Sequence, residues 1–299
     1  MHLLGSLQTK FIALVVATLC FSIGVVTWQS LNDYAQRKLE TDLHALARAA
    51  SARAMANAEQ IEADLRFITT TPPFQGVLRA LDAQGIDPVD RSTTVQWIGR
   101  GDIILNGLLR ARPHYAGVRF IIADGTETFR AIRTGGNVPP APMRDDADFK
   151  AALPLAADRL YAGVFTSAES TGIPVIRYAV TVHKDNAVRG VLMIEATAAA
   201  VFGAADDSAV AADQYVITQT GAVLRRAGSP TDVEAGAQPP WESLLTKIKE
   251  RGDGTLRQGG KLYAFAPLFF NPRERNDHWL SIAAIQKRDA LRDVGSFGT

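Results

Sequence analysis

The sequence predicts an α+β protein with an N-terminal transmembrane helix that continues into a long helix, which carries two units built on antiparallel sheets. Three observations predict this class. An uncharged apolar stretch lies near the N-terminus, a long segment without glycine or proline follows it, and short β-rich runs joined by tight turns fill most of the remainder. Helices and hairpins in this order indicate an α+β fold and not a parallel βαβ sheet.

The apolar segment sets the expected compartment. Residues 11–28 are eighteen residues without a charge, and as a helix they span about 27 Å, close to the hydrocarbon thickness of a bilayer. Lys10 flanks one end and the aromatic Trp28 the other. The positive-inside rule therefore places residues 1–10 in the cytoplasm and the main domain outside. A cleaved signal peptide would need a shorter apolar core and small residues at the cut site, so we expect an uncleaved anchor.

The charge and the cysteine content exclude some classes of binding partner. The 299 residues carry a formal net charge of +1, so no basic surface is expected to attract nucleic acid. The single cysteine, Cys20, lies inside the apolar segment. The remainder of the chain suits an oxidising compartment without disulfides, and it cannot hold a cysteine-based metal cluster.

A long helix is predicted over residues 29–66, and residues 1–28 form the cytoplasmic tail and the membrane span. At 1.5 Å a residue the long helix reaches about 57 Å. Apolar residues recur mostly three or four apart along one face of it and just beyond, at Leu39, Leu43, Leu46, Ala50, Ala54, Ile61, Leu65 and Ile68. Two interpretations stay open, because this face either covers the helix's own domain or also pairs with a second copy. We expect a homodimer.

The membrane-distal unit is assigned to residues 67–203. Thr71-Pro72-Pro73 ends the long helix, because proline removes a backbone donor and restrains the residue before it. The elements expected after it are helices at 74–82 and 92–112, a hairpin of strands 118–123 and 128–133 across Asp124-Gly125, a short helix near Phe149, and strands at 160–165, 175–182 and 188–195.

The membrane-proximal unit is assigned to residues 204–286, and residues 287–299 to an exit segment that leads toward a second span outside this chain. The elements expected in the proximal unit are strands at 214–218 and 222–226 around Thr220-Gly221, a helix at 241–250, and strands at 255–258, 261–267 and 278–285. This order, a hairpin, a helix and then longer strands, repeats the distal unit in architecture but not in residues.

Motifs for catalysis are missing from the sequence. The five histidines, His2, His44, His114, His183 and His278, have no paired spacing for a metal. Gly259-Gly260-Lys261 lacks the spacing of a phosphate-binding loop, and no serine or cysteine nucleophile motif is present. We therefore expect this chain to be no enzyme and to hold no cofactor and no metal.

Several segments resemble a known family. Residues 113–120 (PHYAGVRF) and 124–130 (DGTETFR) resemble a hairpin motif of the double-Cache sensor domains of bacterial receptors. Residues 174–179 with 190–192 are similar to the closing strand pair of that family, and residues 67–80 to the segment after its first helix. The resemblance covers most of residues 7–290.

The resemblance implies two PAS-like units on one long helix, in an extracytoplasmic sensory region of a transmembrane receptor. It further implies an anchor in the bacterial inner membrane, in contact with membrane lipid, a periplasmic main domain and a small-molecule ligand in the distal unit. It also implies a C-terminal partner outside this chain, a histidine kinase, a diguanylate cyclase or a chemoreceptor domain. The sequence does not choose among these outputs.

Arginines on the expected strands are candidates for ligand binding. Arg119 and Arg130 lie on paired strands of one hairpin, and Arg177 lies on another strand. A guanidinium presents a planar fork of donors, so arginines that face a cavity favour small anions such as the carboxylate of an organic acid. The candidate ligand-binding residues are Arg119, Arg130, Tyr161, Arg177 and Tyr178, with Trp97 as a lid and Phe120 as a further wall.

Two observations weigh against this site. Strand alternation puts Arg119 and Phe120 on opposite faces, and arginines that alternate with apolar residues are more often simply solvent-facing. The loop at 166–172 is also shorter than in the family, where it helps to close the pocket. The alternative hypothesis is therefore a membrane-anchored interaction module that binds no small molecule.

Overall fold

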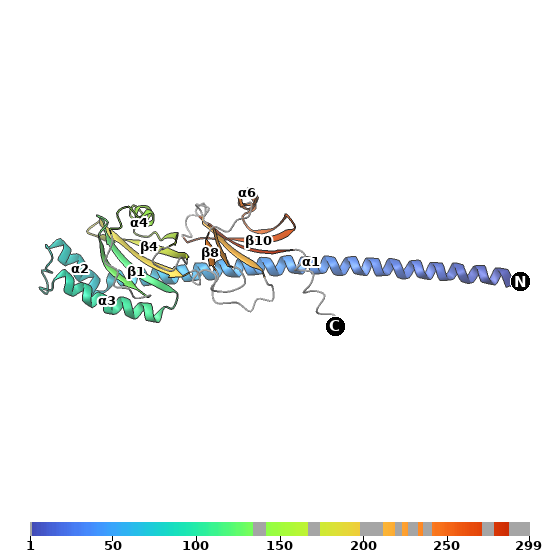
Figure 1. The fold of residues 1–299 in the computed structure, drawn as a ribbon, viewed down its shortest axis with the longest axis horizontal. Helices are drawn as coiled ribbons and strands as arrows, with labels where there is room; N and C mark the ends of the chain where they lie inside the picture. The colour runs from blue at the N-terminus through green and yellow to red at the C-terminus, as the bar shows by residue number, and fades with distance from the viewer. Residues whose placement is uncertain are drawn as a thin grey trace.

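One helix runs through the whole molecule. The computed structural model describes residues 2–133, 142–166, 174–197, 212–218, 223–226, 233–235, 241–270 and 278–286. Helix α1 (His2–Thr70) continues without a break from the apolar segment into the domain, and two sheets lie one after the other along its C-terminal part (Figure 1). The predicted apolar helix that continues into a long helix is confirmed, and its insertion in a membrane stays a prediction. The helix ends at Thr70, one residue before the proline pair.

The N-terminal part of α1 extends beyond both sheets (Figure 1). Among the described residues, the helix at Leu14–Thr70 is long and apolar enough to cross a membrane, with a mean hydropathy of 1.8 in its most apolar window and none of that window buried. Apolar side chains such as Phe21 and Trp28 are therefore exposed on it. A helix that is apolar all round and has no protein cover is suited to an apolar solvent.

The membrane-distal unit holds a five-stranded antiparallel sheet and three further helices. The helices are α2 (Pro72–Asp82), α3 (Thr94–Ala111) and α4 (Ala147–Ala152). The strands are β1 (Tyr115–Ile122), β2 (Glu127–Ile132), β3 (Tyr161–Thr166), β4 (Pro174–Lys184) and β5 (Ala187–Thr197). They lie in the order β2-β1-β5-β4-β3, so the first hairpin pairs with the last strand of the unit.

The membrane-proximal unit repeats this topology. Helix α6 (Trp241–Arg251) lies between a first and a second group of strands. The strands are β6 (Asp213–Ile217), β7 (Val223–Arg226), β8 (Val233–Ala235), β9 (Gly254–Gln258), β10 (Lys261–Leu268) and β11 (Trp279–Gln286). Their order, β8-β7-β6-β11-β10-β9, matches the distal order once the short edge strand β8 is set aside. The predicted repetition of architecture is confirmed, and β8 is an element that the sequence did not predict.

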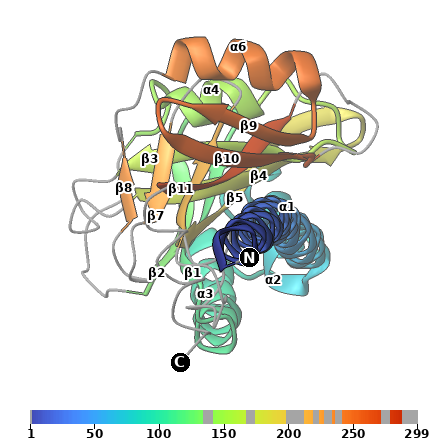
Figure 2. The same cartoon turned by 90° about the vertical axis from the view of Figure 1, so that its right-hand side faces the viewer.

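Both sheets lie between α1 on one side and the short helices α4 and α6 on the other (Figure 2). In the proximal unit Leu43 and Ala47 of α1 pack on Leu262 and Ile285. In the distal unit the stripe continues with residues that join the largest core cluster, Ala54, Ala58, Ile61, Leu65 and Ile68. The apolar face of the long helix thus covers its own domain, and pairing with a second copy stays a prediction.

Some assignments fall outside the described residues. The expected boundary between the two units at 203/204 lies there, and so do the exit segment 287–299 and nearly all of the loop at 166–172. These assignments stay predictions.

Candidate functional site

A cluster of charged side chains lies on the face of the distal sheet that is turned toward α4. We call it the ion cluster; its members are Arg119, Glu127, Arg130, Asp146, Asp148, Arg177 and Glu195. All of them are side chains with little or no exposure. They continue a patch of apolar residues on the same face, where Met143, Phe149 and Ala152 pack on Ile121, Ala179, Val191 and Met193.

Arg177 occupies the centre of the ion cluster. Its Nη1 lies 2.7 Å from Oδ2 of Asp146 and 3.1 Å from Oδ2 of Asp148, and its Nε lies 3.1 Å from Oε1 of Glu195. The guanidinium also stacks on the Phe165 ring, 3.4 Å from its centroid. Burial works against the charged form, but the carboxylates of Glu195 and Asp146 outweigh it and raise the pKa of Arg177. Arg177 therefore stays a buried cation.

Arg119 links the strands on the other side of Glu195. Its Nε donates to Oε1 of Glu195 at 3.1 Å, and its Nη1 lies 2.8 Å from Oε1 of Glu127. Arg119 and Arg130 are direct cross-strand neighbours on β1 and β2. Like charges opposite one another destabilise a sheet, but Glu127 lies between them and its Oε2 is 3.8 Å from Nη1 of Arg130.

Tyr161 joins the cluster through Asp148. Its hydroxyl donates to Oδ1 of Asp148 at 2.6 Å, while the other oxygen of that carboxylate pairs with Arg177. Burial of the phenol and this hydrogen bond raise the pKa of Tyr161 above its usual value. Tyr161 is therefore a neutral hydrogen-bond donor at the edge of the ion cluster.

Asp146 has two roles at the start of α4. One oxygen, Oδ1, accepts from the backbone N–H of Phe149 at 3.0 Å, which is a helix N-cap. The other oxygen, Oδ2, pairs with Arg177. Asp146 thus connects the start of α4 directly to Arg177.

Two glycines make room for the charged groups. Gly163 is the cross-strand neighbour of Arg177, and a Cβ at Gly163 would lie 2.5 Å from the hydroxyl oxygen of Tyr161 and 2.6 Å from Oδ1 of Asp148. Gly117 is opposite Glu195, and a Cβ there would lie 3.2 Å from its Oε2. Larger residues at these positions would push against the ion cluster.

The structure brings four of the six candidate residues together, namely Arg119, Arg130, Tyr161 and Arg177. Tyr178 and the wall residue Phe120 face the opposite way, into the core beneath α1 and α2. Phe120 packs on Phe74, with ring centroids 4.6 Å apart, and Tyr178 meets Phe270 of the proximal unit edge-on at 5.7 Å. The expected alternation of Arg119 and Phe120 is therefore what the structure has. A ligand role for Tyr178 would need access through this core.

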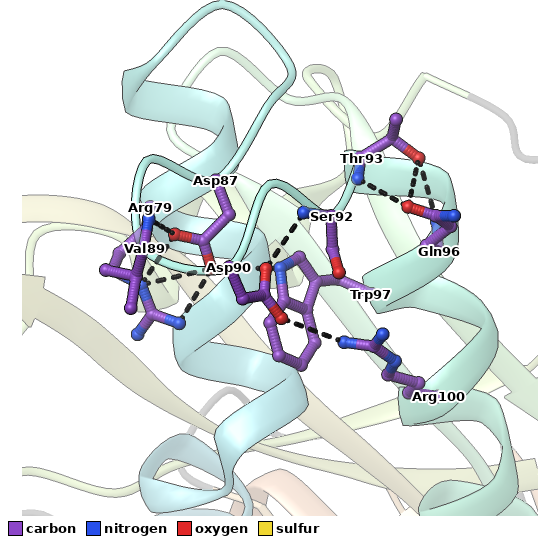
Figure 3. A network of polar contacts seen from close by, with 9 residues as sticks. All are labelled: Arg79, Asp87, Val89, Asp90, Ser92, Thr93, Gln96, Trp97 and Arg100. Carbon is purple, nitrogen blue, oxygen red and sulfur yellow. Dashed lines mark hydrogen bonds and ion pairs between the residues drawn. The ribbon is translucent and has the colours of Figure 1, made fainter.

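Trp97 lies in a separate polar network at the distal tip (Figure 3). Its indole N–H donates to Oδ2 of Asp87 at 3.0 Å, and the same carboxylate pairs with Arg79 at 2.8 Å. Arg100 stacks on the other side of the ring, 4.3 Å from its centroid. The ring packs so closely on Gly76 of α2 that a Cβ there would overlap it. Trp97 thus fastens α3 to α2 and lies on the side of the sheet away from the ion cluster.

Asp87 is the centre of that second network. It is buried, and besides Arg79 and Trp97 it accepts from the backbone N–H of Val89 at 2.9 Å. The hydrogen bond from Arg79 outweighs the cost of burial and lowers the pKa of Asp87 to about 2. This network stabilises the α2–α3 connection and holds no atom of the ion cluster.

Sequence reasoning missed the four carboxylates, Glu127, Asp146, Asp148 and Glu195. Two signals could have pointed to them. Glu195 follows Val191 and Met193 at a spacing of two, so it shares a face with apolar residues. Asp146 and Asp148 flank the start of a short helix, where acidic N-caps are favoured. Neither signal identifies the arginine that each carboxylate meets.

The two hollows described for this structure lie elsewhere. One, of about 280 Å³, lies between α1 and the β9–β10 turn, and a much smaller one is lined by apolar residues of α1, α2, α3 and the sheet. Among the described residues no group of three or more histidine, cysteine or acidic side chains could hold a metal ion. The charged groups of the ion cluster are paired with one another.

In the proximal unit, an apolar cluster of described residues lies on the corresponding face of the sheet. Beneath α6, the side chains of Tyr215, Ile217, Tyr263, Phe265, Leu280 and Ile282 pack on Leu244 and Ile248 of that helix. The topology of the two sheets is the same, so this fold can be built with an apolar face under its short helix. The ion cluster is therefore a property of the distal unit and not a requirement of the fold.

Comparisons with known proteins give a consistent answer for the fold. No family model and no curated protein matches the chain. The extracellular domain of the histidine kinase vpHK1S-Z8 aligns with a TM-score of 0.61 at 15% identity, over 88% of this chain and 98% of that one. A domain of a sensory box/GGDEF family protein from Vibrio parahaemolyticus gives 0.59 at 13% identity, over 84% and 99%.

A third structure is the ligand-binding domain of the Campylobacter jejuni chemoreceptor Tlp3 in complex with 4-methylisoleucine. It aligns with a TM-score of 0.56 at 11% identity, over 86% of this chain and 94% of that one. At these identities the likeness establishes the fold. The expected double-Cache architecture is confirmed, and this chain has the fold of the extracellular sensory domains of histidine kinases, GGDEF proteins and chemoreceptors.

Proposed function

We propose that this chain is the extracytoplasmic ligand-sensing region of a receptor anchored in the bacterial inner membrane, and that a small ligand binds at the ion cluster. The exposed apolar part of α1 supports the anchor, and the positive-inside rule supports a periplasmic domain. The fold supports a sensory role. Homodimerisation through α1 belongs to the same proposal.

The observation that carries the proposal is the buried charge under α4. Replacing buried ion pairs by apolar residues is often neutral or stabilising, by about 1–4 kcal/mol. The apolar face under α6 shows such a replacement within the same chain. Folding alone therefore does not account for the seven charged groups of the ion cluster. Recognition of a polar ligand accounts for them, because buried charged groups with perturbed pKa values cluster at functional sites.

The charges of the cluster suggest the ligand class. Arg177 and Arg119 present donor forks that suit a carboxylate, which would take the place of Glu195 or Asp146 on one of them. Four carboxylates face three guanidiniums, so a ligand that also carries an amino group would find a partner in Asp146 or Asp148. The Tlp3 domains, solved with isoleucine and L-valine, bind ligands of this kind. We propose a small organic acid, with α-amino acids as the first candidates.

Binding of a ligand to Arg177 would be relayed through α4 to α1. A ligand that displaces Asp146 from Arg177 removes the contact that ties the N-cap residue of α4 to the sheet, so the helix can shift. The segment after α4 is fastened to α1, because Nη1 of Arg66 donates to the backbone oxygen of Ala157 at 2.8 Å. A shift of α4 thus biases the packing of the distal unit on α1, which leads to the membrane.

Thermal-shift screening of the full chain in detergent tests the proposal. A ligand that binds only the folded state raises Tm by mass action, so an organic acid or amino acid in the screen should raise it. The shift should vanish in Arg177→Gln and shrink in Tyr161→Phe, which leaves every ion pair in place. Arg110→Gln, on the exposed face of α3, is the control. Binding retained in both cluster variants would place the site elsewhere.

A second candidate is an anchored interaction module without a small ligand. It is favoured by the fact that the arginines of the ion cluster already have carboxylate partners and that neither described hollow lies over them. The same screen separates the two. If no compound moves Tm and Arg177→Gln leaves signalling by the full receptor unchanged, the ligand hypothesis is wrong and this candidate remains.

A further inference from the structure

A hollow of about 280 Å³ lies between α1 and the β9–β10 turn, outside the ion cluster. Its floor is apolar, with Leu39 from α1 and Leu262 from β10, and Arg257 and Lys261 stand at its rim together with Gln36 and Gln258. The turn itself is Gly259-Gly260, with φ of +58° and +75°. A Cβ at either glycine would meet nothing within 4 Å, so the tip of the hairpin borders open space.

The hollow lies at the membrane-facing end of the proximal unit. Strand β10 starts beside Leu39, and its Pro267 oxygen accepts from Ser51 at 2.5 Å, so the strand runs along α1 away from the apolar segment. Trp28 and Tyr34 are 68% and 67% exposed, and aromatic side chains of this kind mark the headgroup level of a bilayer. At 1.5 Å a residue, Gln36 and Leu39 lie only about 3–8 Å beyond Tyr34 along the helix.

The formal charge of this region is +1, because four basic residues, Arg37, Lys38, Arg257 and Lys261, outnumber three acidic ones, Asp33, Glu40 and Asp42. Arg37 and Lys38 follow Tyr34 and are exposed, and the side chain of Lys261 makes no hydrogen bond or ion pair with the described residues. Arg257 pairs with Glu40 at 2.7 Å and donates to Gln36 at 3.2 Å, which holds its guanidinium at the rim. Arg257 and Lys261 both line the hollow, and long basic side chains commonly lay their methylene stems on apolar surface and keep the charged end in polar surroundings.

We infer that this hollow binds the phosphate group of an anionic phospholipid of the outer leaflet. Lys261 and Arg257 would contact the phosphate, and Leu39 and Leu262 the glycerol and the first methylenes of the acyl chains. An apolar floor under a basic rim suits a lipid better than a free phosphate, which has no apolar part. The inference rests on the proposed membrane anchorage and concerns a site separate from the ligand site.

A lipid in this hollow would join α1 to the tip of the β9–β10 hairpin at the level where α1 enters the bilayer. Movement of the proximal unit against α1 would then have to break contacts with the lipid. The lipid composition of the outer leaflet would thereby set how readily the sensory domain moves on its anchor.

Native mass spectrometry of the full chain in detergent tests the inference. Phosphatidylglycerol and phosphatidylcholine with identical acyl chains are titrated separately. Each basic group near an anionic lipid contributes about a fivefold change in affinity. Phosphatidylglycerol should therefore bind at least about fivefold more tightly. Lys261→Gln should weaken phosphatidylglycerol binding about fivefold and phosphatidylcholine binding less, because the choline cation offsets the charge of its phosphate. Lys150→Gln, an exposed lysine of the distal unit, is the matched control.

Three results would overturn the inference: equal affinity for both lipids, equal effects of Lys261→Gln and Lys150→Gln, or displacement of phosphatidylglycerol by inorganic phosphate, which would make the hollow a site for the free anion. Failure of the anchor is measured separately. If the chain recovered from bacterial membranes has lost residues 1–28, the receptor proposal fails, whatever lipid binds in detergent.

Discussion

At the scale of residues, the molecule uses buried charge in two different ways. Asp87 is satisfied by Arg79, Trp97 and a backbone N–H, and it fastens α2 to α3. In the ion cluster, carboxylates and guanidiniums share partners across four strands and a helix cap. The first arrangement joins local segments of the chain, whereas the second joins β1, β2, β4, β5 and α4 and can change if one partner is replaced by a ligand.

Gly76 and Gly99 form a matched pair for testing how Trp97 packs. Alanine favours a helix over glycine by about 1 kcal/mol, so Gly99→Ala, which meets nothing within 4 Å, should stabilise the protein by up to about that amount. Gly76→Ala overlaps the buried Trp97 ring and should destabilise it by about 1–3 kcal/mol. Urea unfolding of both variants measures the difference, and equal effects would contradict the close packing.

Asp87 makes stability depend on pH in acid. Its pKa is about 2 in the folded protein, below the usual value of 3.8, so the unfolded chain takes up the proton first. The stabilisation is fully present above about pH 4 and is lost as the pH falls toward 2. Asp87→Asn should therefore lower stability at pH 7 and flatten the slope between pH 4 and pH 2. An unchanged slope would contradict the assignment.

At the scale of elements, α1 holds the proximal unit through polar contacts as well as the Leu43–Ile285 core. Asp253 lies in the turn between α6 and β9. Its Oδ1 is 2.6 Å from Nε2 of His44, and its Oδ2 is 3.1 Å from Nη2 of Arg48. Gly252 and Asp253 form the turn between α6 and β9, and Gly252 has φ of +74° there. The carboxylate of Asp253 links the proximal unit to α1, the helix that contains the apolar segment.

Asp253→Ala should loosen this link without unfolding the domain. Partly exposed ion pairs contribute no more than about 1 kcal/mol, so Tm should change little, whereas amide exchange in α6 and β9 should speed up. Hydrogen–deuterium exchange measures both units in one experiment. Asp145→Ala, which breaks an exposed pair with Lys150 in the distal unit, should leave the proximal amides unchanged. Equal protection in the two variants would show that Asp253 does not fasten the turn.

At the scale of the whole molecule, the two units share one core. Phe270 meets Tyr178 of the distal sheet at 5.7 Å and Trp279 of the proximal sheet at 4.7 Å, both edge-on. Leu224 and Leu268 of the proximal unit belong to the same buried cluster as Tyr178 and Ile61. The two sheets are therefore in direct contact through this core, in addition to both lying along α1 (Figure 1).

Removing Phe270 should uncouple the units. The native protein is expected to unfold in one cooperative transition, because the shared core is lost as a whole. Phe270→Ala, at a partly buried site, should lower stability by about 1–3 kcal/mol and separate the transition into two. Calorimetry distinguishes one transition from two. A single transition in the variant would show that Phe270 is not needed to couple the sheets.

The sequence by itself determined the order of elements and the alternation of faces. Hydrophobic periodicity and turn chemistry act locally, so the long helix, the hairpins, the short helices and the repeated architecture were predictable, with boundaries shifted by a few residues. Among the strands and helices that the structure describes, only β8 was missed, since its three residues carry too little pattern. The same local rule correctly placed Arg119 and Phe120 on opposite faces of the sheet, because successive side chains alternate along a strand.

Only the tertiary structure decided which charges meet. Arg177 pairs with Glu195 across a strand pair and with Asp146 and Asp148 from a preceding helix, and no periodicity links those positions. The fold likewise turned Tyr178 and Trp97 into the core and not toward the cluster. The physical reason is that burial of a charge depends on every element packed around it, whereas helix and strand formation depend mainly on near neighbours along the chain.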